Sequence, residues 1–321
     1  MIEYNIIKTL GKGQEGTVYQ ISINGINYAL KIEHILQEHI KYSKYSPVWR
    51  EINFCRKVAN KYPDYFINLI DFEIIDSCDH KQYNNLKGLN AERRDKIIKR
   101  NASSYCVKKI YTLIDTTLRE IQHTLNIKQL YSFIIQMFYI FYILHKYKYI
   151  HGDVHDGNIG VIKTNKQYIT IFDMKIPTFG YIYKLIDFGL VLKRSDVEKQ
   201  NMNEFEHKYK IESSNIIYAL ARSDFWNYKL KKHLYIDWKQ VYEKFTKTKE
   251  YNQFKNISDD HFVQMFLFEL LYIDKFRQLV IPNINKHFQV HLYVDIKDII
   301  FILENNNNHK KVIKYFYNKL I

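Results

Sequence analysis

The chain contains few cysteines, prolines and glycines: 3, 4 and 10 of its 321 residues. The cysteines, Cys55, Cys78 and Cys106, are far apart, so their spacing indicates neither a disulfide framework nor a set of metal ligands. We therefore expect a protein of a reducing, cytoplasmic compartment. Lys, Asn, Ile and Tyr are abundant instead, which is the profile of an AT-rich coding sequence.

The sequence also lacks a secretory leader and a long apolar run. Its first residues, 1–5, have no basic start followed by an apolar stretch. The longest apolar segment, Phe133 to Leu144, is interrupted by Gln136 and is too short to cross a bilayer. This segment predicts a buried helix, and we expect no membrane span.

Positive charge is plentiful. The chain has 48 Lys and Arg against 34 Asp and Glu, a formal net charge of +14. Such a charge favours acidic partners, which include nucleotides, nucleic acid, an anionic membrane surface and acidic proteins. AT-rich coding would also account for part of the basic excess. With 46% hydrophobic residues, a chain of this length can form one large domain or two lobes.

The first third of the chain predicts an antiparallel sheet with one helix. Alternating patterns and the Asn24-Gly25 turn predict strands, and apolar residues at three- and four-residue steps predict a helix at 47–60. The strands are expected at 4–10, 17–23, 26–32, 67–75 and 105–111. Between the last two, the segment 79–100 carries seven basic residues and three acids. It is expected to be a surface insertion, either an ordinary solvated segment or a docking patch for an anionic partner.

The remainder is expected to be mainly helical. A long apolar pattern predicts a buried helix at 127–149, followed by short strands at 159–163, 168–172 and 181–186. Helical patterns continue from residue 204, and the last helix is expected at 310–320.

A short polar stretch after the apolar helix is the centre of the functional argument. In residues 151–158, Asp153 and Asn158 stand five positions apart. A carboxylate can accept a proton from an attacking hydroxyl, while an amide oxygen on the same loop coordinates a metal ion on nucleotide phosphates. Alone, this pair is also explained by tight-turn geometry, which both residue types tolerate.

Two earlier elements fit the same chemistry. Residues 11–18 match G-x-G-x-x-G-x-V, and a strand rather than a helix follows the glycines, so the pattern predicts a hairpin and not a dinucleotide-binding turn. Such a hairpin can direct backbone N–H groups at phosphates. Lys31 lies in a buried strand pattern, where a lysine needs an anionic partner. Glu51, on the predicted helix, is the expected partner.

A third acid follows a later strand. Asp187 begins Asp-Phe-Gly directly after the apolar run 183–186, which suits a carboxylate that reaches a metal ion bridging phosphate oxygens. The tripeptide alone is common, but five such elements in one order are specific.

Together these motifs resemble the signature set of the protein-kinase-like superfamily, over about residues 6–220. The resemblance implies a two-lobed α+β fold: a small antiparallel-sheet N-lobe with one helix and a larger, mainly helical C-lobe. It implies one domain over 1–321, with the N-lobe at 1–112, including the basic insertion 79–100, and the C-lobe at 113–321.

The resemblance also implies roles for individual residues. Asp153 matches the catalytic aspartate, Lys31 and Asn158 act with it, and Asn158 and Asp187 match the ligands of Mg²⁺. The cofactors implied are ATP and Mg²⁺. The expected nucleotide-binding residues are Leu10, Gly11, Lys12, Gly13, Gly16, Thr17, Val18, Ala29, Lys31 and Glu51.

The sequence departs from ordinary protein kinases in four places. Gly152 replaces the usual arginine before the catalytic aspartate, and His155 replaces a lysine. No Ala-Pro-Glu motif follows Asp187, because the only later proline, Pro282, lies between Ile281 and Asn283. Asn215 stands where a supporting aspartate is usual. Divergent serine/threonine kinases of large DNA viruses share this combination, which would place the protein in the host cytoplasm or the virion.

We therefore expect ATP-dependent phosphoryl transfer to a serine or threonine hydroxyl of a protein. The spelling around His155 leaves open a small-molecule kinase of the aminoglycoside or choline type. A nucleotide-binding pseudokinase scaffold is a further alternative, although all five polar catalytic positions are filled. We do not expect nucleic acid as a partner, because segment 79–100 mixes acids with its basic residues and lacks regular aromatic residues.

Overall fold

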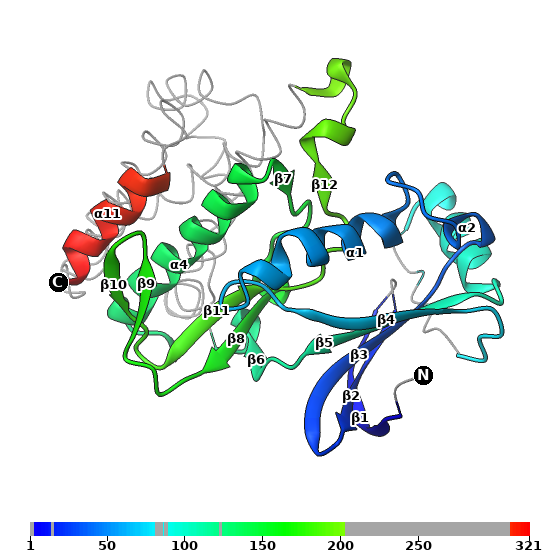
Figure 1. Cartoon of the computed structure of the whole chain (residues 1–321), viewed down its shortest axis with the longest axis horizontal. Coiled ribbons are helices and arrows are strands. Elements are labelled where there is room, and N and C mark those ends of the chain that lie inside the picture. The colour runs from blue at the N-terminus through cyan, green and yellow to red at the C-terminus, as the bar shows by residue number, and fades with distance from the viewer. Residues whose placement is uncertain (1–2, 14–15, 81–85, 87–88, 122–123, 203–308) are drawn as a thin grey trace, which may run out of the picture.

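The computed structural model describes residues 3–13, 16–80, 86, 89–121, 124–202 and 309–321. Its architecture is α+β, as expected. Five antiparallel strands form the largest sheet (Figure 1), in the order β1 (Asn5–Lys12), β2 (Thr17–Ile23), β3 (Ile26–His34), β5 (Cys106–Thr112) and β4 (Leu69–Ile75). These are the five strands predicted for the first third of the chain, and the helix α1 (Pro47–Lys57) lies between β3 and β4 in the sequence, also as predicted.

Tight turns join the first three strands. The glycine-rich segment forms a hairpin, in which Gly11 pairs with Val18 and the N–H of Gly13 donates to the carbonyl of Gly16 at 2.9 Å. Asn24 and Gly25 both have positive φ, which is the backbone conformation that a two-residue hairpin turn requires. The glycines thus open into a strand, and the hairpin prediction is confirmed.

Alternation along β3 separates two environments. Leu30 and Ile32 lie with Ile21 and Ile110 in a small core on one face of the sheet. Lys31 lies on the opposite face, because successive side chains of a strand point to opposite sides. This second face is covered by α1, whose Phe54 is fully buried.

The described α-helices and strands that follow β5 in the sequence form a second group, in which α4 (Ile127–Lys146) is the longest helix. They comprise β6 (Thr116–Thr117), α3 (Leu118–Ile121), β7 (Tyr149–Ile150), β8 (Ile159–Lys163), β9 (Tyr168–Ile171), β10 (Met174–Pro177), β11 (Tyr181–Leu185), β12 (Leu192–Lys193) and α11 (His309–Leu320). The last of these lies beside α4 (Figure 1), and its Phe316 packs on Tyr131 with ring centroids 5.6 Å apart. The two longest predicted helices of this region are therefore present, as are the three predicted strands.

Two polar side chains interrupt the apolar sequence of α4 because they bind the neighbouring strands. Gln136 accepts a hydrogen bond from the N–H of Tyr183 at 3.0 Å and donates to the carbonyl of Tyr181 at 3.2 Å. Ser132 donates to the carbonyl of Pro177 at 2.6 Å. These bonds attach β10 and β11 to the helix.

The described residues of the predicted surface insertion include one helix, α2 (Ala91–Asn101). Only Ile97 of this helix is buried, and Asn90 caps its N-terminus by accepting a hydrogen bond from the N–H of Arg93. Lys96 pairs with Glu92 at 2.6 Å on the exposed surface. Helix α2 is thus largely solvated, and it carries five of the basic residues of the insertion.

The expectation about the cysteines is wrong for one pair. Cys78 and Cys106 form a disulfide, with their Cα atoms 5.6 Å apart. Cys106 opens β5 opposite Ile75 at the end of β4, so antiparallel pairing brings the two cysteines together across the insertion. This disulfide removes the cysteine-based argument for a reducing compartment. Cys55 is a buried free thiol.

In the part of the chain that the structure describes, the helices do not combine the length and apolar character needed to cross a bilayer. The helical patterns predicted from residue 204 to 308, including Asn215 and Pro282, lie outside the described residues.

Candidate active site

Two loops carry the polar motif residues, and strand pairing brings them together. Asn158 directly precedes β8 and Asp187 follows β11 by two positions, while Ile159 pairs with Leu185 in the antiparallel ladder. The N–H of Ile186 donates to the carbonyl of Asn158 at 3.1 Å. These pairings put Asn158 and Asp187 at the same edge of the small sheet.

A buried histidine braces the same two loops. The Nε2 atom of His151 lies 2.9 Å from the carbonyl oxygen of Ile186, so it carries the proton and donates. Its Nδ1 atom then accepts from the N–H of Asp153 at 3.3 Å. The side chain is fully buried, and burial lowers the pKa of His151. The neutral ring therefore holds the Asp153 loop against the Asp187 loop.

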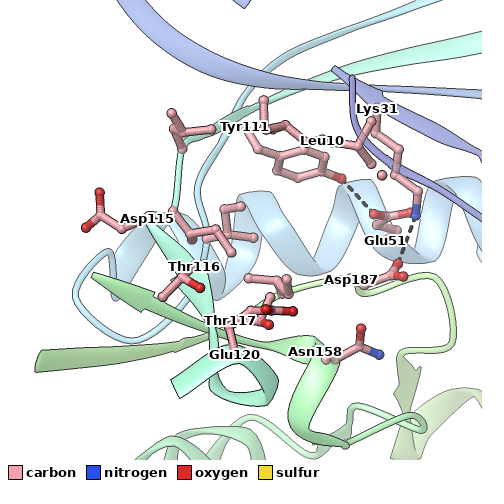
Figure 2. Close-up of a pocket in the computed structure, with 18 residues that line it drawn as sticks. Leu10, Lys31, Glu51, Tyr111, Asp115, Thr116, Thr117, Glu120, Asn158 and Asp187 are labelled. Atoms are coloured by element: carbon pink, nitrogen blue, oxygen red, sulfur yellow. Dashed lines mark hydrogen bonds and ion pairs between the residues drawn. The ribbon is translucent and has the colours of Figure 1, made fainter. Parts of the chain in front are cut away.

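Asp153 and Asn158 are in direct contact. The Nδ2 atom of Asn158 donates to the backbone carbonyl of Asp153 at 2.9 Å and to its Oδ2 at 3.1 Å. The amide oxygen of Asn158 points toward Asp187 (Figure 2). The Asp153 side chain is 47% exposed, so its carboxylate is open to an incoming hydroxyl.

Lys31 reaches the third motif residue. Its Nζ lies 2.8 Å from Oδ1 of Asp187 and 3.5 Å from Glu33. Burial alone lowers the pKa of Lys31, but the carboxylates of Asp187, Glu33 and Glu51 outweigh burial and raise it well above the ordinary value. The charge of Lys31 in turn lowers the pKa of Asp187. The pair is therefore ionised.

The predicted pairing of Lys31 with Glu51 is wrong. Glu51 is buried and bonds instead to Lys109 at 2.5 Å and to the hydroxyl of Tyr111 at 2.6 Å (Figure 2 shows the latter). Lys109 lies directly opposite Lys31 in the β3–β5 ladder, so both lysines are on the face that α1 covers. Lys109 is fully buried and also binds Glu33 at 2.5 Å. Lys109 is thus the lysine partner of Glu51, a role that was expected of Lys31.

This cluster has an excess of negative charge. Lys31 and Lys109 share three carboxylates, those of Glu33, Glu51 and Asp187. Burial alone lowers the pKa of Lys109, but Glu33 and Glu51 raise it, so both lysines are cationic. In the ionised state the cluster has one more negative than positive charge. Such a site favours a bound cation beside Asp187.

A cavity of about 540 Å³ lies between the five-stranded sheet and the two loops. Part of the predicted nucleotide-binding set lines it: Leu10, Gly11, Val18, Ala29, Lys31 and Glu51. Asn158 and Asp187 line it as well, whereas Asp153 adjoins it through its bonds with Asn158. Lys12, Gly13, Gly16 and Thr17 are not among the lining residues, and Thr17 is buried. An added Cβ on Gly16 would lie 2.6 Å from the carbonyl of Ile32, so that glycine permits close strand approach.

The structure adds residues that the motifs did not indicate. Tyr111 lines the cavity with its phenol held by Glu51, and the segment 113–117 forms the wall beyond it. Phe188 is fully buried against Phe54 of α1, with ring centroids 4.7 Å apart. The alternating apolar pattern of residues 105–111 predicted this strand. It did not indicate that Lys109 and Tyr111 face α1.

The structure explains the two unusual residues of the motif, Gly152 and His155. Gly152 has a φ of +85°, and an added Cβ would lie 2.6 Å from the carbonyl of Leu190, so an arginine does not fit this backbone. The Nδ1 atom of His155 accepts from the N–H of Gly157 at 3.0 Å, while its Nε2 lies 3.7 Å from Oδ2 of Asp153. His155 is thus a neighbour of the exposed carboxylate.

Comparison with known proteins gives no assignment. No protein-family model matches the chain, and no curated protein is a detectable relative.

Proposed function

We propose that this protein is a phosphotransferase that moves the terminal phosphoryl group of ATP to a serine or threonine hydroxyl of a protein. The proposal includes the two-lobed organisation of a protein-kinase-like domain, with the cavity between the lobes. One observation carries it: Lys31 and Asp187, 2.8 Å apart, line the same cavity as Asn158, whose amide binds Asp153. Four groups from three distant parts of the sequence therefore meet at one place.

The residues present fit a magnesium ion. The Asp187 carboxylate and the Asn158 amide oxygen are hard oxygen ligands, which Mg²⁺ prefers, and they would hold it. The Asn158 nitrogen is engaged by Asp153, which leaves the oxygen facing Asp187 (Figure 2). The negative excess of the surrounding cluster agrees with a cation here. Magnesium, when bound, neutralises charge on phosphate oxygens.

The roles of the chain's own groups follow from their positions. Lys31 would attract phosphate oxygens, since it is a buried ammonium on the cavity wall. The exposed carboxylate of Asp153 would orient the acceptor hydroxyl and take its proton. Asn158 and His151 would hold that carboxylate in place. Positioning and charge neutralisation would then provide most of the rate enhancement.

The test is transfer of radiolabelled γ-phosphate from ATP with Mg²⁺. Wild-type protein should label a generic basic protein on serine or threonine. Asp153→Ala should lose turnover by several orders of magnitude and still bind nucleotide, because Asp153 adjoins the cavity without lining it. Asp64→Ala, which changes an exposed aspartate paired with Lys166, is the matched control and should keep wild-type activity.

Other outcomes assign the protein differently. Label on an amino sugar or choline but not on protein would establish the small-molecule alternative, which the position of His155 beside Asp153 favours. Nucleotide binding without any transfer would indicate a pseudokinase scaffold. Equal turnover in wild type and Asp153→Ala would refute the role of Asp153.

A further inference from the structure

A second group of chemically reactive side chains lies at the base of the insertion, away from the cavity. His34 ends β3 and pairs in register with Cys106, which opens β5, and Cys78 follows β4. The ligand atoms of these three residues lie within 4.8 Å of one another. His34 and Cys106 are buried, while Cys78 is partly exposed.

The ring of His34 is held in one orientation. Its Nε2 lies 2.7 Å from the carbonyl oxygen of His80, and its Nδ1 lies 2.9 Å from that of Ser103. Nδ1 is also 3.5 Å from the sulfur of Cys106. A neutral imidazole has one N–H, and with that proton on Nε2 the lone pair of Nδ1 faces an oxygen and a sulfur. Both ring nitrogens of His34 therefore face carbonyl oxygens, and the sulfur of Cys106 lies close to Nδ1.

We propose that, once the disulfide is reduced, His34, Cys78 and Cys106 bind one Zn²⁺ ion. Two thiolates and an imidazole are ligands that zinc prefers. Ligand atoms about 2.0 to 2.3 Å from a tetrahedral zinc lie about 3.3 to 3.8 Å apart. Once reduced, the two sulfurs must therefore separate from bonding distance, while the His34 nitrogen already lies within 4.8 Å of both. The N–H of His34 that donates to the His80 carbonyl is the outer hydrogen bond that fixes a ligating histidine.

His80 is the candidate for the fourth ligand. Its Nε2 is buried and has no hydrogen-bond partner among the described residues, which is an unusual state for a ring nitrogen. Its ring lies 6.1 Å from that of His34, centroid to centroid. A turn of this side chain toward the sulfurs would complete a Cys₂His₂ site.

The chemistry balances as follows. A dithiol reductant transfers two electrons and two protons to the disulfide, giving the thiols of Cys78 and Cys106 and its own disulfide. Zinc binding then releases the two thiol protons, because thiolates are the ligands. The disulfide and the metal site are therefore two alternative links at the same place. Either would join the two ends of the insertion that carries α2.

The experiment uses Co²⁺ as a spectroscopic probe for zinc in the full chain. After reduction in denaturant, alkylation of a sample should count three thiols, and the remainder is refolded under reductant. Co²⁺ should bind at one per chain and give thiolate-to-cobalt absorption with the visible bands of a tetrahedral site. An equivalent of Zn²⁺ should abolish this spectrum.

Matched variants locate the site. Cys78→Ser and Cys106→Ser should lose the thiolate-to-cobalt absorption, whereas Cys55→Ala, which removes the buried free thiol of α1, should keep it. If circular dichroism shows that a serine variant is unfolded, the cobalt spectrum of the wild-type chain alone tests the proposal. Three counted thiols without thiolate-to-cobalt absorption would overturn the proposal. Reoxidation of Cys78 and Cys106 to the disulfide during refolding under reductant would overturn it as well. Neither reading depends on phosphotransferase activity.

Discussion

Lys109 shows how one buried residue can change the pairing that a motif implies. It is fully buried between Glu33 and Glu51, and its ammonium pairs with both carboxylates. Lys109→Met keeps the side-chain volume but leaves two buried acids without this partner. We expect a loss of about 3 to 5 kcal/mol in the free energy of unfolding.

Urea denaturation measures this loss. Lys108→Met is the control, since Lys108 is adjacent on β5 and only partly buried, and it should change stability by less than about 0.5 kcal/mol. Similar losses in the two variants would show that the buried ion pairs contribute nothing specific.

His151 predicts a dependence of stability on pH. Its pKa is lowered by burial, so between about pH 6.5 and the lowered value the unfolded chain binds a proton that the folded chain does not. Stability therefore falls as pH drops through this window, by at most about 1.4 kcal/mol per pH unit.

His151→Asn removes this titration. Urea midpoints at pH 7 and pH 5, in protein without added metal, should differ less in the variant than in the wild type. The variant should also be less stable at pH 7, because the brace to Ile186 is lost. Identical pH dependence in both proteins would contradict the assignment.

Individual motif residues could be placed from the sequence because each follows or precedes a recognisable strand or turn. Asp153, Asn158, Asp187 and Lys31 do meet, as the motif order implies. The partner of Glu51 could not be predicted, because it depends on the register that sets Lys109 opposite Lys31. Such register between distant strands is fixed by packing, and local pattern does not reveal it.

At the scale of elements, Gln136 connects α4 to the strand that leads to Asp187. It satisfies the N–H of Tyr183 and the carbonyl of Tyr181 on β11. Gln136→Leu keeps the size of the side chain but leaves both backbone groups without this partner. We expect a loss of about 2 to 4 kcal/mol in the free energy of unfolding.

The control for Gln136→Leu is Gln37→Leu at an exposed position, which should be nearly neutral in urea denaturation. Gln136→Glu is also informative, because a carboxylate can accept from Tyr183 and cannot donate to Tyr181 while ionised. It should be destabilised as well, most at neutral pH. A neutral effect of Gln136→Leu would mean that α4 does not hold β11 through this residue.

Element boundaries followed the sequence closely where turn residues mark them. The Asn24-Gly25 turn and the glycine hairpin fixed β2 at both ends. Short elements such as β7 and β12 were not predicted, since two residues carry no periodicity. Gln136 interrupted the apolar pattern for a reason that only the position of β11 shows. The Cys78–Cys106 disulfide likewise depends on the pairing of β4 with β5.

At the scale of the whole molecule, binding of nucleotide should stabilise the fold. A ligand at 100 times its Kd stabilises the native state by about 2.7 kcal/mol. Thermal denaturation with ATP and Mg²⁺ should therefore show a higher Tm than without them. Lys31→Met should reduce this shift, because it removes the cavity's buried ammonium.

Lys175→Met, in the hairpin of β9 and β10, is the matched control and should respond to nucleotide as the wild type does. An equal shift in Lys31→Met and in the control would show that Lys31 does not contact the nucleotide. No shift in the wild type at millimolar nucleotide would count against the proposed function as a whole.

The bond of Glu51 to Lys109 has a consequence for how the protein could be controlled. Helix α1 is anchored to the sheet by a pair that does not involve Lys31, and Phe54 anchors it to Phe188. Swinging this helix outward would break that pair and separate Phe54 from Phe188. For the proposed phosphotransferase, control by displacement of α1 would therefore be energetically costly.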